Sequence, residues 1–441
     1  MLEAAETIGG GTRTAELTLP GFRHDVCSAI HPLASASPFF RSLELDFGLI
    51  ESPAALAHPL DDGSAVIVRR SVEETAAGLG QDADAYQNLF GRLVADWDRL
   101  EDEVLRPIVH VPLHPLLLSR FGLTALRSAS GVARSRFKTK PGRALFAGAA
   151  AHSFLPLERR GSASFALVLL LLAHVAGWPF PRGGSQAIAD KLAERLQSLG
   201  GEIETGRKVS SLRDLPPARL VLCDVTPRQL EQLAADLLPD RYRRRLRRWR
   251  YGPGVCKVDY ALDGPIPWRA AEVAESATVH IGGTLDDIAA SERAPWEGRN
   301  AERPFVLLAQ QTLFDDSRAP AGKHTAWAYC HVPNGSTVDA STHIEAQIER
   351  FAPGFGELVL ARAVRGPAEL EHENANLVGG DISGGANDLA QLLARPAPRA
   401  VPYSTPVPWL YICSSSTPPG GGVHGICGHL AAKAALRARL P

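Results

Sequence analysis

Three glycine-rich turns, at the start, in the middle and near the end of the 441-residue sequence, each lead into a helix or a strand. The sharpest is LYICSSSTPPGGGVHGICGHLAAKAAL, in which a buried strand ends in hydroxyl residues, two prolines stiffen the turn, and a helix follows. The free N–H groups and the positive dipole end of such a helix stabilise an anion, or a ring that gains negative charge. An ordinary strand-to-helix turn has the same composition, so this segment alone does not identify a site.

The other two turns are weaker signals that gain weight together. The opening, MLEAAETIGGGTRTAEL, reads as the end of a strand with acidic Glu3, followed by Gly9, Gly10 and Arg13. An acidic residue in that position of a βαβ unit accepts hydrogen bonds from a ribose hydroxyl. The middle turn, WPFPRGGSQAIADKLAERL, again places glycines before a helix. Three such entries, far apart in one α/β chain, suit a large cofactor that distant segments contact together.

Composition excludes several classes of protein. With 47 basic and 48 acidic side chains the formal charge is -1, which provides no field to attract nucleic acid. Six cysteines occur singly, without CxxC spacing, and no signal-peptide pattern is present, so we expect a protein of a reducing compartment such as the cytoplasm. His110 and His114 are four residues apart, but Pro112 lies between them and no glutamate follows the first histidine, so we expect no metal site.

The pattern of predicted elements indicates a nucleotide-binding fold that a second domain interrupts twice. Strands and hairpins give way to helical spacing near residue 70, α/β patterns return near residue 180, and strands dominate after residue 250. We therefore predict an α/β fold in which residues 1–70, 180–250 and 400–441 form a Rossmann-like domain, and residues 71–179 and 251–399 form an inserted α+β substrate domain.

Two segments raise the question of a lipid contact. The run ASFALVLLLLAHVAGW has sixteen residues, fewer than the roughly 20 that span a bilayer, so we interpret it as a buried core helix. A helix this apolar could also line a tunnel for an apolar substrate. The basic run RYRRRLRRWRYG is typical of a solvated helix face, and a lipid-headgroup contact is its alternative. A peripheral membrane contact and a homo-oligomer both stay open.

Over essentially the whole chain, the sequence resembles the flavin-dependent oxidoreductases of the phytoene desaturase and amine oxidase type. The segments that carry this resemblance are LEAAETIGGGTRT, GFRHDVCSAIHPLASASPFF, WPFPRGGSQAIADKL, YGPGVCKVDYALDGPIPW and the long C-terminal stretch from NLVGGDISGG to HGICGH. The resemblance implies an FAD cofactor. It implies that Glu3 holds the adenosine ribose, that Gly9, Gly10 and Arg13 lie along the pyrophosphate and flavin, that Val209 contacts the adenine, and that Gly421, Gly422 and Val423 cover the isoalloxazine. Ser415, in the hydroxyl run, is a further cofactor-binding candidate.

In this family a strand, a GxGxxG turn and a helix precede the position of Leu2, and the sequence here starts without that unit. The turn supplies N–H groups that cradle a pyrophosphate, and the strand lies centrally in the sheet. We therefore expect a Rossmann-like domain truncated at its first βα unit, with weak FAD binding and unpaired strand edges.

The cofactor of a flavoenzyme performs the electron transfer, so protein residues need only position the substrate and move protons. The resemblance brings His31, His424 and Lys257 nearest to the flavin, followed by His152 and His331. A structural, hydrogen-bonded role is at least as good an interpretation of each. We predict an FAD-dependent oxidoreductase that removes hydrogen from a C–C or C–N bond of an apolar or amphipathic small molecule. The alternative is a non-catalytic interaction or regulatory protein that has lost full FAD binding.

Overall fold

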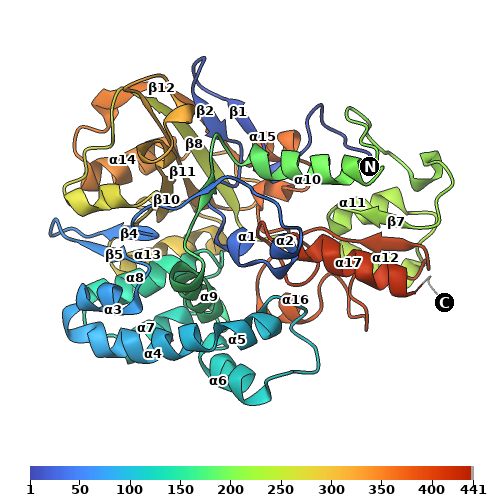
Figure 1. The fold of residues 1–441 in the computed structure, drawn as a ribbon, viewed down its shortest axis with the longest axis horizontal. Coiled ribbons are helices and arrows are strands. Elements are labelled where there is room, and N and C mark those ends of the chain that lie inside the picture. Colours follow the sequence, from blue (N-terminus) through green and yellow to red (C-terminus); the bar gives the residue numbers. More distant parts are fainter. Residues whose placement is uncertain (439–441) are drawn as a thin grey trace.

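The computed structural model describes residues 1–438 and has one large mixed sheet, in the left half of the molecule as Figure 1 shows it. Its seven strands lie in the order β12-β8-β11-β10-β9-β4-β5. All neighbours are antiparallel except β4 and β9, which are parallel. The strands are β4 (Leu56–Pro59), β5 (Ala65–Val68), β8 (Gly254–Leu262), β9 (Thr278–Ile281), β10 (Val306–Ala309), β11 (His324–Val332) and β12 (Val359–Arg365).

The two longest strands, β8 and β11, form the middle of the sheet and pair along nine residues each. Lys257 lies opposite Tyr329, and Asp259 lies opposite Trp327. Directly opposed residues of an antiparallel pair point to the same face of the sheet. The pairing therefore places a lysine, a carboxylate and two aromatic rings side by side on one face.

A layer of helices covers this face of the sheet (Figure 1). Trp327 and Tyr329 belong to the same apolar core as residues of α8 and α9, while α14 (Ser341–Phe351) packs against the opposite face. The helices of the covering layer are α3 (Val72–Ala77), α4 (Ala83–Ala95), α5 (Trp97–Val104), α6 (Pro115–Ala125), α7 (Ala129–Arg136), α8 (Lys140–Ala151), α9 (Ser162–Val175) and α13 (Leu285–Arg293).

Helix α9 contains the most apolar run of the sequence and is a core helix, as predicted. Leu170, Leu171 and Leu172 have no exposed surface. The helix packs against α4, α6, α7 and α8, and at one end against α1 (Pro32–Ala36). Across residues 1–438, every helix is too short or too polar to traverse a bilayer.

A second α/β region lies beside the large sheet and contains the glycine-rich segments. Strands β7 (Val221–Cys223) and β13 (Leu410–Ile412) pair in parallel, and Leu2 forms a parallel bridge with Glu204. Its helices are α10 (Gln186–Ser198), α11 (Pro227–Leu233), α12 (Asp240–Arg247) and α17 (Ile426–Arg437). Parallel strands with flanking helices agree with the predicted α/β class. Residues 439–441 of the last predicted segment lie outside the described residues.

Short elements connect the two regions. The predicted hairpins are confirmed: one joins β1 (Thr14–Glu16) to β2 (Arg23–Asp25), and the other joins β4 to β5. The second hairpin falls within the predicted segment 1–70, yet its strands extend the large sheet. The domain division stays a prediction. The remaining elements are β3 (Leu49–Ile50), β6 (Phe180–Pro181), α2 (Pro38–Ser42), α15 (Pro367–Glu373) and α16 (Leu389–Leu393).

Candidate functional site

The glycine turn at the start of the chain lies against the first turns of α10. Gly9 and Gly10 have φ angles of 113° and 53°, in the region that L side chains rarely adopt. A Cβ on Gly9 would lie 3.2 Å from the Cβ of Ala189. The side-chain amide of Gln186 donates a hydrogen bond of 3.2 Å from Nε2 to the carbonyl oxygen of Ile8. Glycine is therefore needed here for both the turn and the close approach to α10.

Arg13 fastens this turn to the end of α15. Its Nε donates to the carbonyl oxygen of Gly10 at 3.0 Å, and its Nη2 donates to that of Glu373 at 2.9 Å. The guanidinium thus lies along the glycine turn, where the resemblance places the pyrophosphate. Its contact with a cofactor stays a prediction.

Glu3 lies beside the segment that leads to Val209, although 206 positions separate Glu3 and Val209 in the sequence. The N–H of Glu3 donates to the carbonyl oxygen of Glu204 at 2.8 Å, and the N–H of Arg207 donates to the carbonyl oxygen of Glu3 at 2.8 Å. The Glu3 carboxylate accepts from the N–H of Ala5 at 2.8 Å. Val209 follows two residues after this ladder and is half-buried. Glu3 is therefore paired with residues 204–207, and its contact and that of Val209 with a cofactor stay predictions.

The glycine turn before α17 is packed closely on both sides. A Cβ on Gly421 would lie 3.1 Å from the carbonyl oxygen of Ser383, and a Cβ on Gly422 would lie 2.5 Å from Leu33. Gly422 has a φ of 128°. Ser415 lies so close to Gly384 that a Cβ there would be 2.2 Å from its Oγ. These contacts place the C-terminal turn beside α1.

Both glycine turns lie near α10. Gly9 approaches Ala189, and Val423 packs against an apolar cluster that includes Ile188. A shared cradle for one cofactor stays a prediction. The larger of the two best-defined cavities in residues 1–438 is about 170 Å³ and lies elsewhere, between α12 and α16.

The residues at and near the two glycine turns are of the chemical types that bind a flavin dinucleotide. Glycines that leave backbone accessible, a hydroxyl run from Ser414 to Ser416, and the Arg13 guanidinium are groups that bind phosphate and polar ring edges. The buried Nδ1 of His31 has no hydrogen-bond partner within the described part of the chain. An unpaired buried polar atom costs free energy, so a ligand that bonded to it would be stabilised.

Asp25 is the centre of a buried polar network that joins the hairpin β1–β2 to α10. Its Oδ1 accepts from the N–H of Ser185 at 2.6 Å, and its Oδ2 accepts from Nη1 of Arg318 at 2.6 Å. The hydroxyl of Ser185 in turn lies 2.8 Å from Nε2 of His31. Burial lowers the pKa of His31 to about 4, against the opposing effect of Asp25. His31 is therefore a neutral imidazole held in place by this network.

Lys257 lies at the centre of a second buried network. Its Nζ donates to Oδ1 of Asp259 at 2.5 Å, and Nη2 of Arg365 donates to Oδ2 of Asp259 at 2.7 Å. Arg365 also pairs with Glu373 at 2.9 Å. Burial lowers the pKa of Lys257 to about 8, although the carboxylate of Asp259 acts in the opposite direction. Lys257 can therefore exchange a proton near neutral to mildly alkaline pH.

Aromatic rings and the opening segment surround Lys257. Its Nζ lies 5.4 Å from the centre of the Trp327 ring, and Trp327 stacks with Tyr329 at 5.4 Å between ring centres. Cys27 is near enough that the charge of Lys257 acts on its thiol, whose pKa burial raises. The Cβ of Cys27 lies 3.9 Å from where a Cβ of Gly11 would be. The lysine, the aromatic pair and the first glycine turn thus adjoin one another.

The other candidate histidines have structural partners. Nδ1 of His424 accepts from the N–H of Ile426 at 3.0 Å, and its Nε2 lies 3.1 Å from the carbonyl oxygen of Gly420. His152 pairs with His280 at 2.9 Å, and His331 pairs with Glu292 at 2.6 Å. Both ring nitrogens of His424 are therefore used inside its own turn. Catalytic roles for His31, His424 and Lys257 stay predictions.

Sequence analysis missed the charged partners Asp25, Asp259, Arg318 and Arg365. A signal for two of them existed: KVD places Lys257 and Asp259 inside an otherwise apolar strand, and RHD places Asp25 between the apolar residues Phe22 and Val26. Charges are almost never buried without a partner, so such interruptions indicate a buried ion pair. The identity of the partners could not be read in the same way, because Arg318 lies 293 residues from Asp25.

Comparison with known proteins agrees with this architecture. No family model matches the chain. Pyridine nucleotide-disulfide oxidoreductase domain-containing protein 2 of Rattus norvegicus is 26% identical over 519 residues, which cover 99% of this chain and 89% of that protein. Phytoene dehydrogenase of Streptomyces griseus is 26% identical over 298 residues, which cover 62% of this chain and 55% of that protein.

Solved structures give the same fold. A putrescine oxidase from a redesign of cofactor binding has a TM-score of 0.60 at 15% identity, with 99% of this chain and 92% of that chain covered. The resemblance to the phytoene desaturase and amine oxidase type, and within it to the branch of pyridine nucleotide-disulfide oxidoreductase domain-containing protein 2, is confirmed. The chain is thus similar to oxidoreductases of this type, and to that branch along almost its whole length.

Proposed function

We propose that this chain binds FAD and removes hydrogen from a C–C or C–N bond of an apolar or amphipathic small molecule. The observation that carries the proposal is buried Lys257, which faces an aromatic pair beside the first glycine turn. FAD, when bound, would supply the acceptor for the electrons. The residues that would hold it are Glu3, Gly9, Gly10, Arg13, Val209, Ser415, Gly421, Gly422 and Val423.

Lys257 is suited to hold or release a proton at Nζ. Its pKa of about 8 means that both protonation states are populated near that pH, which is the condition for efficient general acid–base chemistry. Asp259 accepts its hydrogen bond and fixes the direction of Nζ, while Arg365 holds the second oxygen of that carboxylate. In this proposal Asp259 and Arg365 are positioning residues.

The surroundings of Lys257 favour an apolar substrate. Trp327, Tyr329 and Leu307 lie in the apolar core that covers this face of the sheet, so they exclude water from the neighbourhood of Nζ. The two cations Lys257 and Arg365 are matched by the carboxylates of Asp259 and Glu373. This balance leaves neither of these two carboxylates free for a substrate ammonium group, which favours a C–C bond over the C–N bond of an amine.

Flavin binding and substrate oxidation can be tested separately. The purified chain would be incubated with FAD, separated from free cofactor by gel filtration, and examined for a bound flavin spectrum. Bound flavin would then be mixed without oxygen with a polyprenyl alkene or with a primary amine. We expect the alkene to bleach the absorbance of the bound flavin. Mass spectrometry should then show a product with two hydrogen atoms fewer than the alkene supplied.

A pair of lysine variants provides the control. Lys257→Met removes the buried amine, and Lys323→Met removes a half-exposed amine that pairs with Asp263. We expect substrate-dependent bleaching to fall only in Lys257→Met. Absence of bound flavin would contradict FAD binding and favour the non-catalytic alternative. Bleaching with the amine alone would overturn the preference for a C–C bond.

A further inference from the structure

The helix α6 and the loop before it carry an unusual number of exposed apolar side chains. Val109, Val111, Leu116 and Leu123 are 71%, 87%, 81% and 76% exposed. Ile108, Leu113 and Leu126 are also exposed, so seven such residues occur within nineteen positions. We name these seven residues the apolar tip. Soluble surfaces rarely gather large apolar side chains in this way unless the patch contacts another partner.

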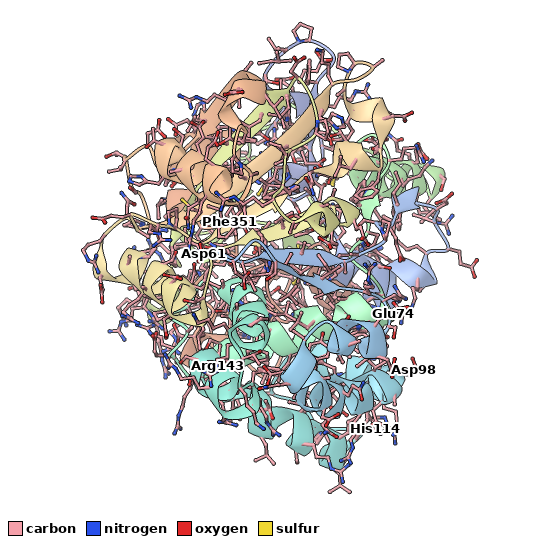
Figure 2. All side chains as sticks on the ribbon, turned by 90° about the vertical axis from the view of Figure 1, so that its left-hand side faces the viewer. Asp61, Glu74, Asp98, His114, Arg143 and Phe351 are labelled. Atoms are coloured by element: carbon pink, nitrogen blue, oxygen red, sulfur yellow. The ribbon has the colours of Figure 1, made fainter. Side chains whose placement is uncertain are left out.

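The apolar tip projects from one end of the molecule. Figure 1 shows α6 at the lower edge, beyond the helices that cover the sheet, and Figure 2 shows His114 at the lower end of the same layer. The buried face of α6 packs on α9 through Phe121 and Ala125. The opposite face, with Leu116 and Leu123 two turns apart, has no element of the described chain over it.

A buried carboxylate holds the loop of the tip in one conformation. Oε2 of Glu103 lies 2.5 Å from Nε2 of His110, and Oε1 accepts from the N–H of His114 at 2.7 Å. Glu103 itself is 3% exposed. The loop therefore presents its valines and leucines on a fixed support.

The chemistry of the loop backbone also suits a lipid surface. Pro107, Pro112 and Pro115 lack an N–H group, so three backbone donors that would need a partner away from water are absent. The Nδ1 of His110 lies 2.8 Å from the carbonyl oxygen of Pro107. The cost of placing this loop among headgroups and acyl chains is reduced accordingly.

The sequence segment that contains the tip carries charged residues of one sign, although Arg106 and Arg134 pair with Asp102 and Asp286 from outside it. Residues 104–157 contain no aspartate or glutamate and eight basic residues: Arg106, Arg120, Arg127, Arg134, Arg136, Lys138, Lys140 and Arg143. Arg120 lies between Leu116 and Leu123 on the exposed stripe of α6. The nearest exposed acids precede this segment on α5, where Asp102 pairs with Arg106. An apolar face with interspersed arginines is complementary to an anionic bilayer surface.

We propose that the apolar tip is a docking site for an anionic lipid surface, into which the loop and the outer face of α6 insert. This inference is independent of the proposed function, because it uses no residue of the flavin site. It also differs from a contact through the arginine-rich α12, where Arg243 and Arg247 are paired with Glu231. The tip combines basic residues with exposed apolar ones, which α12 does not.

The test uses the full chain and vesicles of two compositions. Purified protein would be sedimented with vesicles of phosphatidylcholine alone, or of equal parts phosphatidylcholine and phosphatidylglycerol. We expect stronger binding to the mixed vesicles, weakened by high salt. Leu116→Ser with Leu123→Ser should lower the partition coefficient about tenfold or more, since both side chains would leave the lipid. Arg120→Glu should weaken binding to the mixed vesicles more than to phosphatidylcholine.

Matched controls separate this surface from others. Leu199→Ser with Leu393→Ser changes two exposed leucines elsewhere, and Arg244→Glu with Arg248→Glu changes the charge of the α12 region. Both control pairs should bind vesicles as the unchanged protein does. Failure of the unchanged protein to sediment, or equal losses in the controls, would overturn the proposal. So would a homodimer in analytical ultracentrifugation that Leu116→Ser with Leu123→Ser dissociates.

Discussion

Lys257 and Asp259 lie two residues apart on β8, and the ammonium of Lys257 donates a hydrogen bond of 2.5 Å to Oδ1 of Asp259 in the interior of the protein. Side chains at i and i+2 of a strand point to the same face, so the strand itself brings the pair together. Arg365 on the neighbouring strand β12 occupies the other oxygen of Asp259. Lys257 therefore donates to a carboxylate that Arg365 holds in place, and its Nζ also faces the ring of Trp327.

The first prediction concerns the pH dependence of catalysis. Because burial lowers the pKa of Lys257 to about 8, the neutral amine becomes the main form only above that pH. If the neutral amine accepts a proton, the rate of flavin reduction should rise with pH through an apparent pKa near 8. In Lys257→Met the rise of the rate with pH should disappear, and the rate of flavin reduction should fall about 100-fold, in line with general acid–base contributions. Stopped-flow absorbance across pH measures both, and an identical limb in Lys257→Met would refute the role.

The second prediction concerns the Asp25 network. Replacing Asp25 by Asn removes the charge that faces Arg318, which is 1% exposed. Removing one partner of a buried ion pair costs about 3 kcal/mol or more where the other charge is left uncompensated. Arg318 keeps a second buried partner, Asp315 at 2.9 Å, so we expect a cost somewhat below that value. Asp263→Asn, in the half-exposed pair with Lys323, should cost less than about 1 kcal/mol. Urea unfolding gives both free energies, and equal costs would show that the Asp25 pair contributes no more than a surface pair.

The sequence predicted local elements well and long-range partners poorly, for a physical reason. The mainly apolar segments GVCKVDYAL and HTAWAYCHV predict strands, but the register that places Tyr329 opposite Lys257 depends on the whole sheet. The glycine turns indicated a close approach of the backbone to a cofactor, whereas the neighbours that the structure shows are residues of α10 and α1. The exposure of α6 could not be predicted, since an apolar helix that faces lipid and one that faces a core have the same composition.

The third prediction concerns acid stability. Burial lowers the pKa of His31 to about 4, whereas the unfolded value is 6.5. Between these values the unfolded chain binds a proton that the folded chain does not, so the stabilisation present above pH 6.5 is lost as the pH falls toward 4. His31→Gln should show a shallower loss of unfolding free energy over this window, by at most about 3 kcal/mol. The exposed control His372→Gln should keep the slope of the unchanged protein, as urea unfolding at several pH values would show.

The last prediction concerns the glycine turn before α17. Here the steric effect of an added Cβ can be measured separately from the strain of the backbone φ angle. Gly422 has a φ of 128°, and a Cβ there would lie 2.5 Å from Leu33. Gly422→Ala should destabilise the fold by about 1–3 kcal/mol and weaken FAD binding, because both the backbone and the contact are strained. Gly200 has a φ of 82° and no atom within 4 Å of an added Cβ. The variant Gly200→Ala is therefore the control for backbone strain alone. Adding Leu33→Ala to Gly422→Ala should recover the part due to the contact. Urea unfolding and flavin titration of the four variants, including Leu33→Ala, would measure this coupling, and simple additivity would mean that Leu33 does not close the turn.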